Sequence, residues 1–295
     1  MELYTELFKK RYFVGVQPVT IDSDNFNPRI PYFITYKLDG ARNLLLFSGN
    51  TNYTISSKME FTPYFLPNKS SLYKNSVIDG EMYKGVFYAF DILFYNGNDL
   101  RNTVLTERLV FLKRLVEDIK SKKLILKKYE TPYKNSHSRA GNTPYHSRNT
   151  CKNFFAVKRK FSEFMKLGGD IDGIILTPDS IYKTTVLKWK PVNLISIDFR
   201  INKIDNNRFE LLLQNGEIFK PLGEHKDIGI TTVPESIYKT YKNNSIAEFI
   251  FLNGKFIPIR ERPDKTKPNH ISVINSNFKQ ILKPLNIRKE CEKFY

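Results

Sequence analysis

The sequence has few cysteines, no long apolar run and no leader-like start. Two cysteines among 295 residues are too few for a disulfide framework. No stretch approaches the roughly 18 apolar residues that suggest a membrane span. The first residues, MELYTELFKKRYF, carry charges every few positions, unlike a secretory signal. We therefore expect a soluble, intracellular globular protein with no membrane partner.

Positive charge is abundant instead. The chain has 47 Lys and Arg against 30 Asp and Glu, a formal net charge of +17, and no single basic tail holds the excess. A positive surface favours polyanionic partners and makes their binding sensitive to salt. Charge alone does not separate RNA from DNA or from a nucleotide, and a solubilising surface in a lysine-rich proteome would look the same.

The pattern of the chain predicts two domains, since about 150 residues per domain is usual. Short β-rich runs and helices fill the first two-thirds, with a polar, aperiodic loop between the helices. The strands are expected at 32–35, 41–47, 76–82 and 86–95, the helices at 106–120 and 152–167, and the loop at 131–150. After Pro191, short strands joined by Asn215-Gly216 and Asn253-Gly254 turns suit a meander of about five strands in an OB-type barrel. A last helix is expected over 273–282, before Pro284.

The first segment that suggests chemistry is Tyr-Lys-Leu-Asp-Gly-Ala-Arg at 36–42, between two strand-like runs. Lys37 would lie at the lip of a sheet, and Gly40 would permit a turn that a Cβ could not enter. As a nucleophile Lys37 must lose its proton, which the neighbouring cations Lys188 and Lys190 would favour. A turn that merely carries surface charges is the alternative for this motif taken alone.

Further motifs follow in order: Asp79-Gly80-Glu81, Phe90-Asp91, Asp172-Gly173-Ile174-Ile175 and Leu187-Lys188-Trp189-Lys190-Pro191. In a strand, Lys188 and Lys190 point to the same face, where they would repel each other unless a phosphate lay between them. Glu81 and Asp172 end apolar runs, where an unpaired carboxylate is costly, so a metal, a ribose hydroxyl or a lysine must meet them. This composition is typical of a nucleotide site.

The ordered set resembles the covalent nucleotidyltransferases, which comprise mRNA-capping guanylyltransferases and polynucleotide ligases. The resemblance runs from about Gly15 to Asn269. Two elements point to capping. Gly-Val-Gln-Pro-Val-Thr at 15–20 is similar to a capping-enzyme element that ligases lack, with Thr20 where serine is usual. Arg-Pro-Asp-Lys-Thr-Lys-Pro-Asn at 262–269 fits the Arg-x-Asp-Lys-x-x-x-Asn motif of the capping-enzyme OB domain, and Asp198-Phe199 matches a recurrent dipeptide.

The resemblance implies a two-domain α+β fold. An antiparallel-sheet nucleotide-binding domain would cover 1–193, completed by a C-terminal helix at 273–295, and an OB-fold domain would cover 194–272. It also implies the reaction: GMP passes from GTP through a lysyl-N-GMP intermediate to the 5′-diphosphate end of RNA, forming the GpppN cap.

Roles carry across to individual residues. Lys37 would attack the α-phosphate of GTP, Arg42 and Glu81 would hold the ribose hydroxyls, and Phe90 would stack on guanine. Asp172 would help to place a divalent metal, Mg²⁺ or Mn²⁺, or orient the nucleophile.

The remaining roles concern phosphate. Lys188 and Lys190 would contact the α-phosphate, with Lys188 also near the base edge. Arg262 and Lys265 would reach the β- and γ-phosphates when the second domain closes, and Asp264 would orient them. Nucleotidyl transfer depends mainly on positioning and on neutralising phosphate charge, which suits this set.

The resemblance also implies partners. A chain of this length leaves no room for a triphosphatase or cap methyltransferase, so separate polypeptides would supply those steps, with the transcribing RNA polymerase as a further partner. A cellular protein would then be nuclear, and a viral one cytoplasmic or in the virion.

Two alternatives stay open at this point. A small ATP-dependent DNA or RNA ligase would share the lysine motif and the two domains, although residues 15–20 and 262–269 count against it. A non-catalytic RNA-binding protein could retain the fold, but it would have no reason to keep Lys37, Glu81, Asp172 and the paired lysines together.

Overall fold

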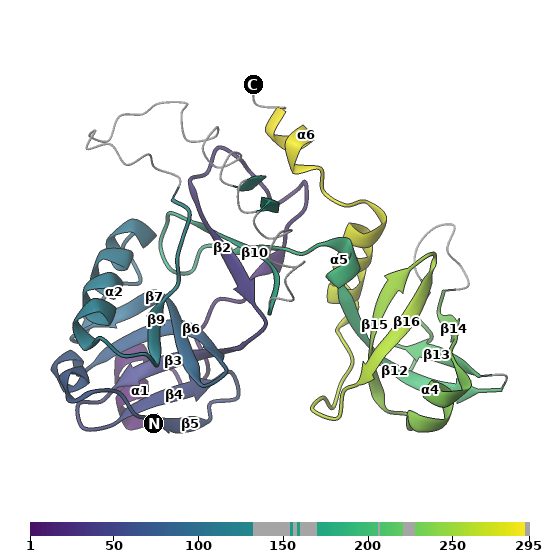
Figure 1. The fold of residues 1–295 in the computed structure, drawn as a ribbon, viewed down its shortest axis with the longest axis horizontal. Coiled ribbons are helices and arrows are strands. Elements are labelled where there is room, and N and C mark those ends of the chain that lie inside the picture. Colours follow the sequence, from purple (N-terminus) through teal and green to yellow (C-terminus); the bar gives the residue numbers. More distant parts are fainter. Residues whose placement is uncertain (132–153, 156–157, 160–169, 206, 221–227, 293–295) are drawn as a thin grey trace. The chain divides into compact units, whose positions relative to one another are not determined.

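The structure is a computed structural model that describes residues 1–131, 154–155, 158–159, 170–205, 207–220 and 228–292 (Figure 1). The chain forms two compact units. The first unit comprises residues 1–21, 25–189 and 287–295, and the second comprises 22–24 and 190–286. The predicted loop at 131–150 and helix at 152–167 fall almost entirely outside the described residues. So do His137, His146 and Cys151, whose spacing matches no standard zinc site.

A seven-stranded, mostly antiparallel sheet is the larger sheet of the first unit. Its order is β5-β4-β3-β6-β7-β8, with β9 pairing in parallel to β7. The strands are β3 (Ala41–Phe47), β4 (Asn52–Ser56), β5 (Phe61–Tyr64), β6 (Ser76–Tyr83), β7 (Val86–Tyr95), β8 (Asn98–Asp99) and β9 (Leu124–Leu126). The predicted bounds of β3 and β7 are correct and that of β6 is one residue short. β7 is rich in aromatic and β-branched residues, and β3 contains the continuous apolar run at 44–47.

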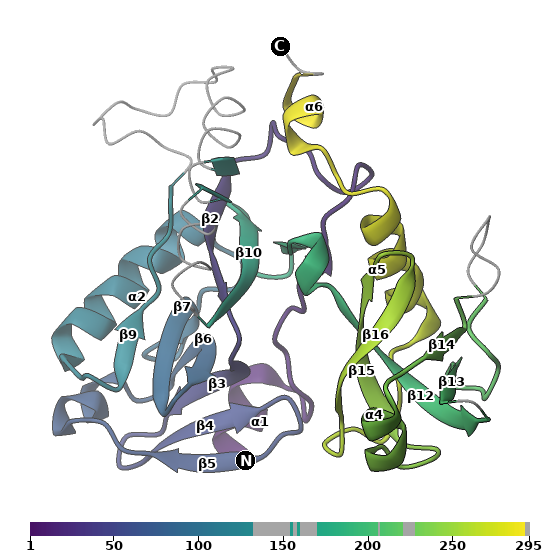
Figure 2. The same ribbon diagram turned by 45° about the vertical axis from the view of Figure 1, so that its right-hand side comes forward.

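Successive side chains of these strands point to opposite faces of the sheet, and each face forms part of a hydrophobic core. Helix α2 (Leu105–Ile119) covers one face of the sheet, where Leu45 and Phe47 pack with Leu112 and Leu115 (Figure 2). On the opposite face, the neighbouring positions Leu44 and Leu46 pack with Tyr4 and Phe8 of α1 (Glu2–Phe8). The 3₁₀ helix η1 (Asn68–Tyr73) connects β5 to β6. Asp79 and Glu81 share the α1 face because they follow Val77 at two-residue intervals.

A second, four-stranded sheet completes the first unit in the order β1-β11-β10-β2. Its strands are β1 (Val19–Thr20), β2 (Tyr32–Leu38), β10 (Ile171–Pro178) and β11 (Leu187–Trp189). Segments from both ends of the unit therefore lie side by side, and Lys37 of β2 pairs with Gly173 of β10. The short helix α6 (Ile287–Glu292) is also assigned to this unit.

The second unit is a five-stranded antiparallel sheet, β14-β13-β12-β15-β16. Its elements are β12 (Ser196–Ile204), β13 (Arg208–Leu212), β14 (Ile230–Thr232), β15 (Ile246–Leu252), β16 (Lys255–Glu261), α4 (Glu235–Thr240), α5 (Ile271–Leu282) and the 3₁₀ helix η2 (Val192–Leu194). Asn253 and Gly254 both have positive φ, 51° and 81°, in the predicted hairpin turn between β15 and β16.

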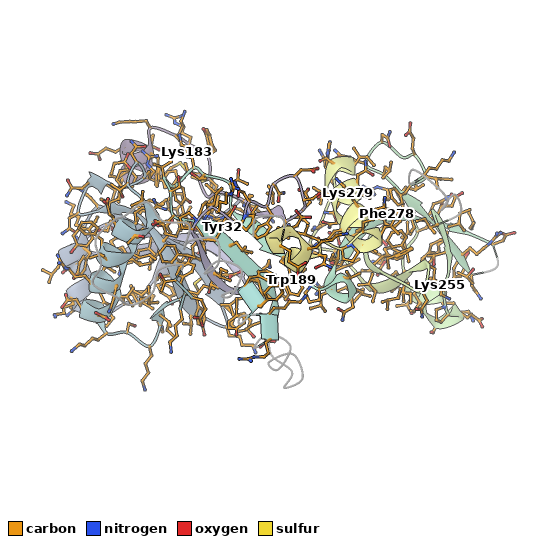
Figure 3. All side chains as sticks on the ribbon, turned by 90° about the horizontal axis from the view of Figure 1, so that it is seen from above. Tyr32, Lys183, Trp189, Lys255, Phe278 and Lys279 are labelled. Atoms are coloured by element: carbon orange, nitrogen blue, oxygen red, sulfur yellow. The ribbon has the colours of Figure 1, made fainter. Side chains whose placement is uncertain are left out.

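Helix α5 corrects one expectation. The C-terminal helix at 273–295 was expected to complete the first domain; residues 287–295 do belong to the first unit, but Ile274, Phe278 and Ile281 of α5 pack into the core of the second unit. Figure 3 labels two successive residues of this helix, of which Phe278 is buried and Lys279 exposed. The apolar stripe predicted that one face is buried, but it could not identify the covering sheet.

In the part of the chain that the structure describes, no helix is both long enough and apolar enough to cross a membrane.

Candidate functional site

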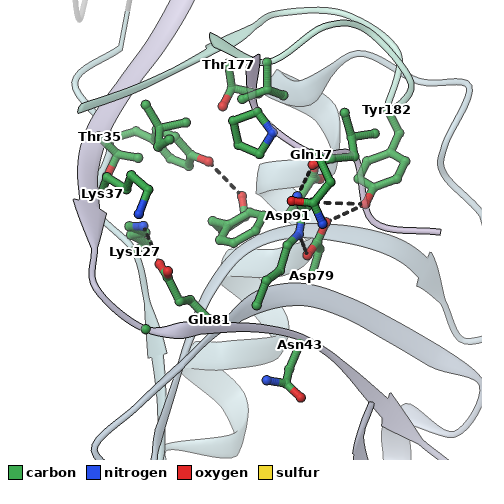
Figure 4. Close-up of a pocket in the computed structure, with 18 of the residues that line it drawn as sticks. Gln17, Thr35, Lys37, Asn43, Asp79, Glu81, Asp91, Lys127, Thr177 and Tyr182 are labelled. Atoms are coloured by element: carbon green, nitrogen blue, oxygen red, sulfur yellow. Dashed lines mark hydrogen bonds and ion pairs between the residues drawn. The ribbon is translucent and has the colours of Figure 1, made fainter. Parts of the chain in front are cut away.

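The first unit contains a cavity of about 410 Å³. Its walls come from both sheets of that unit: Thr35, Lys37 and Ile175 from the smaller sheet, and Asp79 and Glu81 from the larger (Figure 4). The element at 15–20 contributes Val16, Gln17 and Pro18 to the lining. The structure therefore brings together motifs that are dispersed over most of the first unit.

Lys37 enters the cavity from the end of β2 beside Asp172 of β10. Its Nζ lies 2.9 Å from Asp172 Oδ1 and 3.2 Å from Oδ2, and the two side chains are only 23% and 19% exposed. The neighbouring Gly40 has a packing reason to be glycine, because a Cβ there would lie 2.7 Å from the carbonyl oxygen of Met82 and 2.8 Å from Glu81 Cγ. The turn thus lets the end of β2 approach the end of β6 closely.

Glu81 meets a cation that the sequence did not reveal. Lys127, which follows β9, lies with its Nζ 3.4 Å from Glu81 Oε2, and its side chain is 8% exposed. Burial lowers the pKa of Lys127, and the attraction of Glu81 opposes that change. The available signal was the position of Lys127, a charged residue placed directly after the apolar strand β9.

Arg42 is anchored by a buried carboxylate. Its Nε and Nη2 lie 3.0 and 2.5 Å from the two oxygens of Asp79, which is completely buried. Burial alone would lower the pKa of Arg42, but the attraction of Asp79 outweighs it and raises that pKa above its ordinary value. Arg42 also donates to the carbonyl oxygen of Val16. The guanidinium is therefore held in a fixed orientation in the cavity wall.

Phe90 lines the same cavity between cations. The Arg42 guanidinium carbon lies 5.3 Å from the centroid of its ring and Lys127 Nζ lies 5.6 Å from it. The next residue, Asp91, is buried and accepts two hydrogen bonds of 2.8 and 2.9 Å from Arg108. Burial raises the pKa of Asp91, while Arg108 opposes that rise. This ion pair fixes β7 beneath the aromatic ring.

The paired lysines behave differently from each other. Lys188 pairs with Ile175, which pairs with Thr35, so the register places Lys188 on the sheet face that lines the cavity. Strand β11 ends at Trp189, and Lys190 belongs to the second unit. The strand geometry that was expected to align the two lysines therefore applies to Lys188 alone.

The predicted phosphate ligands of the second unit form their own cluster. Arg262 donates hydrogen bonds of 2.9 and 2.8 Å to Asp264 and one of 3.2 Å to Asp198, and Lys265 also binds Asp198. The hydrogen bonds from Arg262 lower the pKa of Asp264 to about 2. Asp198, on β12, is 4% exposed and organises both cations.

A divalent cation was expected near Asp172. Among the described residues, no three His, Cys, Asp or Glu side chains form a group that could hold a metal ion. Asp172 nevertheless offers carboxylate oxygens at the cavity, and magnesium is commonly held by one or two carboxylates together with substrate phosphates. The donor set fits that mode and does not provide an all-protein cage.

The family model and the relatives found by sequence agree on one family. The family described as "mRNA capping enzyme, catalytic domain" matches residues 5–192. The chain is 27% identical to the mouse mRNA-capping enzyme over 288 residues, covering 87% of this chain and 45% of that protein. It is 28% identical to an African swine fever virus mRNA-capping enzyme, covering 66% of this chain and 21% of that protein. The chain thus spans less than half the length of these relatives.

Among solved structures, the chain is similar to a mycobacterial DNA ligase D complexed with ATP and MES. The TM-score is 0.46 at 14% identity, covering 85% of this chain and 94% of that chain.

Proposed function

The chain belongs to the mRNA capping enzyme family, and we propose that it is an RNA guanylyltransferase. In the reaction, Lys37 Nζ attacks the α-phosphorus of GTP, the bond to the β-phosphate oxygen breaks, and pyrophosphate leaves. The lysyl-N-GMP intermediate then passes GMP to the 5′-diphosphate end of RNA, which forms the GpppN cap and frees Lys37. The observation that carries the proposal is a lysine, held by Asp172, in a cavity whose walls also contain Arg42, Glu81 and Phe90.

We assign the ribose hydroxyls to Arg42 and Glu81 and the guanine ring to Phe90. The two cations against the Phe90 ring leave the aromatic group in a fixed position, which suits a stacking partner. A divalent cation, Mg²⁺ or Mn²⁺, would be held by Asp172 and the phosphates, and it would neutralise charge on the phosphate oxygens. Asp172 in addition keeps Lys37 oriented in the cavity.

We assign binding of the three phosphates of GTP to basic residues. We assign the α-phosphate to Lys188 and Lys190, and the β- and γ-phosphates to Arg262 and Lys265, with Asp264 orienting Arg262. The bidentate pair of Arg262 with Asp264 supports this, because a fixed guanidinium matches the geometry of phosphate oxygens.

Each of the two units is also assigned a domain type. We propose that the first unit is the nucleotidyltransferase domain and that the five-stranded second unit is an OB-fold domain. A separate triphosphatase would supply the RNA 5′-diphosphate end, and a separate methyltransferase would act on the cap. The relatives include mouse and viral proteins, so the location would be the nucleus for a cellular protein and the cytoplasm or virion for a viral one.

Covalent labelling tests the proposal. The purified protein is incubated with a divalent metal and α-³²P-labelled GTP or, separately, ATP, and then resolved by denaturing electrophoresis. Acid-labile, alkali-stable label from GTP alone is expected. Label from ATP alone would assign the protein to the ligases, and no label from either nucleotide would favour a binding protein without catalysis.

A further inference from the structure

The Arg42 guanidinium has most of its hydrogen atoms committed to protein acceptors. Nε and Nη2 donate to the two oxygens of Asp79, a second contact from Nη2 reaches Tyr182 Oη at 3.5 Å, and Nη1 donates to the carbonyl oxygen of Val16. A guanidinium carries five N–H groups. Within the described part of the chain, these contacts leave one N–H, on Nη1, to meet a ligand in the cavity. The direction of that single donor depends on how Asp79 is held.

Tyr182 is a second side chain that holds Asp79, beside Arg42. Its hydroxyl donates to Asp79 Oδ2, the same oxygen that Arg42 Nη2 binds (Figure 4). Tyr182 is 6% exposed, and burial raises its pKa well above the ordinary value, so the hydroxyl keeps its proton and remains a donor.

The rest of Tyr182 is fixed by its surroundings. Its ring packs in the core that contains Tyr4 and Phe8, and the Arg108 guanidinium lies 5.9 Å from the centroid of that ring. Its backbone N–H donates to the carbonyl oxygen of Arg101 at 2.8 Å. A rigid donor therefore sets the position of Asp79, and Asp79 sets the position of Arg42.

We propose that Tyr182 is a positioning residue for sugar recognition, which acts through Asp79 to aim the remaining N–H of Arg42 at a ribose hydroxyl. This rests on the proposed function, since it concerns the nucleotide that Lys37 attacks. Removing the Tyr182 hydroxyl lets the Asp79 carboxylate turn, and the ligand loses one hydrogen bond to a charged group. The loss falls on nucleotides with ribose hydroxyls and spares those without them.

The test compares GTP with 2′,3′-dideoxy-GTP as the labelling nucleotide. For each, the rate of enzyme–GMP formation is measured against nucleotide concentration, which gives a maximal rate and a half-saturating concentration. In Tyr182→Phe we expect the half-saturating concentration of GTP to rise about 10-fold, the size of one hydrogen bond to a charged group, with that of the dideoxy nucleotide nearly unchanged. The preference of Tyr182→Phe for GTP over the dideoxy nucleotide would therefore fall by about the same factor, and the maximal rate of labelling would change little.

Tyr4→Phe is the matched control. Tyr4 lies in the same core and donates a part-buried hydroxyl hydrogen bond of 2.8 Å to the carbonyl oxygen of Tyr12, and among the described residues no hydrogen bond joins it to Arg42 or Asp79. Its preference for GTP should equal that of the wild type even if its urea midpoint falls as far as that of Tyr182→Phe.

Two outcomes overturn the inference: an unchanged preference in Tyr182→Phe, or equal weakening of both nucleotides. If Tyr182→Phe does not fold, Asp79→Asn must reduce the preference in the same way, and an unchanged preference there overturns the inference too. Failure of the wild type to label with GTP refutes instead the proposed function.

Discussion

Glu81 is the only carboxylate within salt-bridge distance of the Lys127 ammonium among the described residues. Replacing Glu81 by glutamine removes this negative charge. Both side chains are largely buried, 13% exposed for Glu81 and 8% for Lys127. Breaking a buried ion pair by neutralising one partner costs about 3 to 5 kcal/mol, because the other charge stays behind without compensation. We expect the free energy of unfolding at pH 7 to fall by about 3 kcal/mol, the lower end, because Lys127 can release its proton.

The loss should depend on pH in a defined direction. Burial already lowers the pKa of Lys127 below its ordinary value of 10.5, and Glu81 opposes that effect, so Glu81→Gln lowers this pKa further. The unfolded chain then binds more protons than the folded protein between the lowered pKa and 10.5, so stability rises with pH in that window. The deficit of the variant relative to the wild type should therefore shrink between pH 7 and pH ~9.5, by about 1 to 2 kcal/mol.

Urea unfolding at the two pH values measures both effects. With a slope of about 2 to 3 kcal/mol per molar urea, a 3 kcal/mol loss moves the midpoint by roughly 1 M. Glu117→Gln is the control, because Glu117 pairs with Lys113 at 3.7 Å on an exposed face of α2 and should cost at most about 0.5 kcal/mol. Lys127→Met combined with Glu81→Gln should recover most of the loss. A deficit that stays constant with pH would refute the reasoning.

Three further predictions concern the nucleophile, the phosphates and the core. Lys37→Ala should abolish covalent labelling while the protein remains folded, and Lys37→Arg should fail equally, because a guanidinium does not deprotonate; label on either variant would exclude Lys37 as the nucleophile. Arg262→Ala should slow enzyme–GMP formation far more than transfer of GMP from preformed enzyme–GMP, because pyrophosphate is present only in the first step, and equal losses would contradict this assignment. Arg108→Met leaves the buried Asp91 carboxylate unpaired and should lower the free energy of unfolding by about 3 to 5 kcal/mol, whereas the double variant with Asp91→Asn should lose much less; urea unfolding of both distinguishes a buried pair from a dispensable one.

Much of the sheet structure is predictable from sequence because local patterns suffice. Short continuous apolar runs define β3, β6 and β7, and Asn253-Gly254 marks a hairpin turn because both residues tolerate positive φ. The same local information predicts that α5 has a buried face. It does not predict which core receives that face, since many amphipathic helices share the pattern.

Some residues of the site are also recognisable from local sequence, whereas their partners are not. Lys37, Glu81 and Asp172 are recognisable because a charged side chain at the end of an apolar strand must meet a partner. The partners themselves depend on the fold: Lys127 meets Glu81 from 46 positions along the chain, and Tyr182 meets Asp79 from 103. Tyrosine is common in this chain, and nothing in the immediate neighbourhood of Tyr182 distinguishes it from the others. The position of Lys127 directly after an apolar strand indicates that it needs a partner, but it does not identify Glu81 as that partner.

The pairing of β2 with β10 has a consequence for how the protein folds. Lys37 and Asp172 are 135 positions apart along the chain. The strands of the larger sheet and helix α2 lie between β2 and β10 in the sequence. Contacts between such distant segments form late, because the entropy of closing a long loop must be overcome first. During synthesis, the lysine would therefore emerge long before the carboxylate that orients it, and a nascent chain would be unable to react with nucleotide until β10 and β11 had joined the smaller sheet.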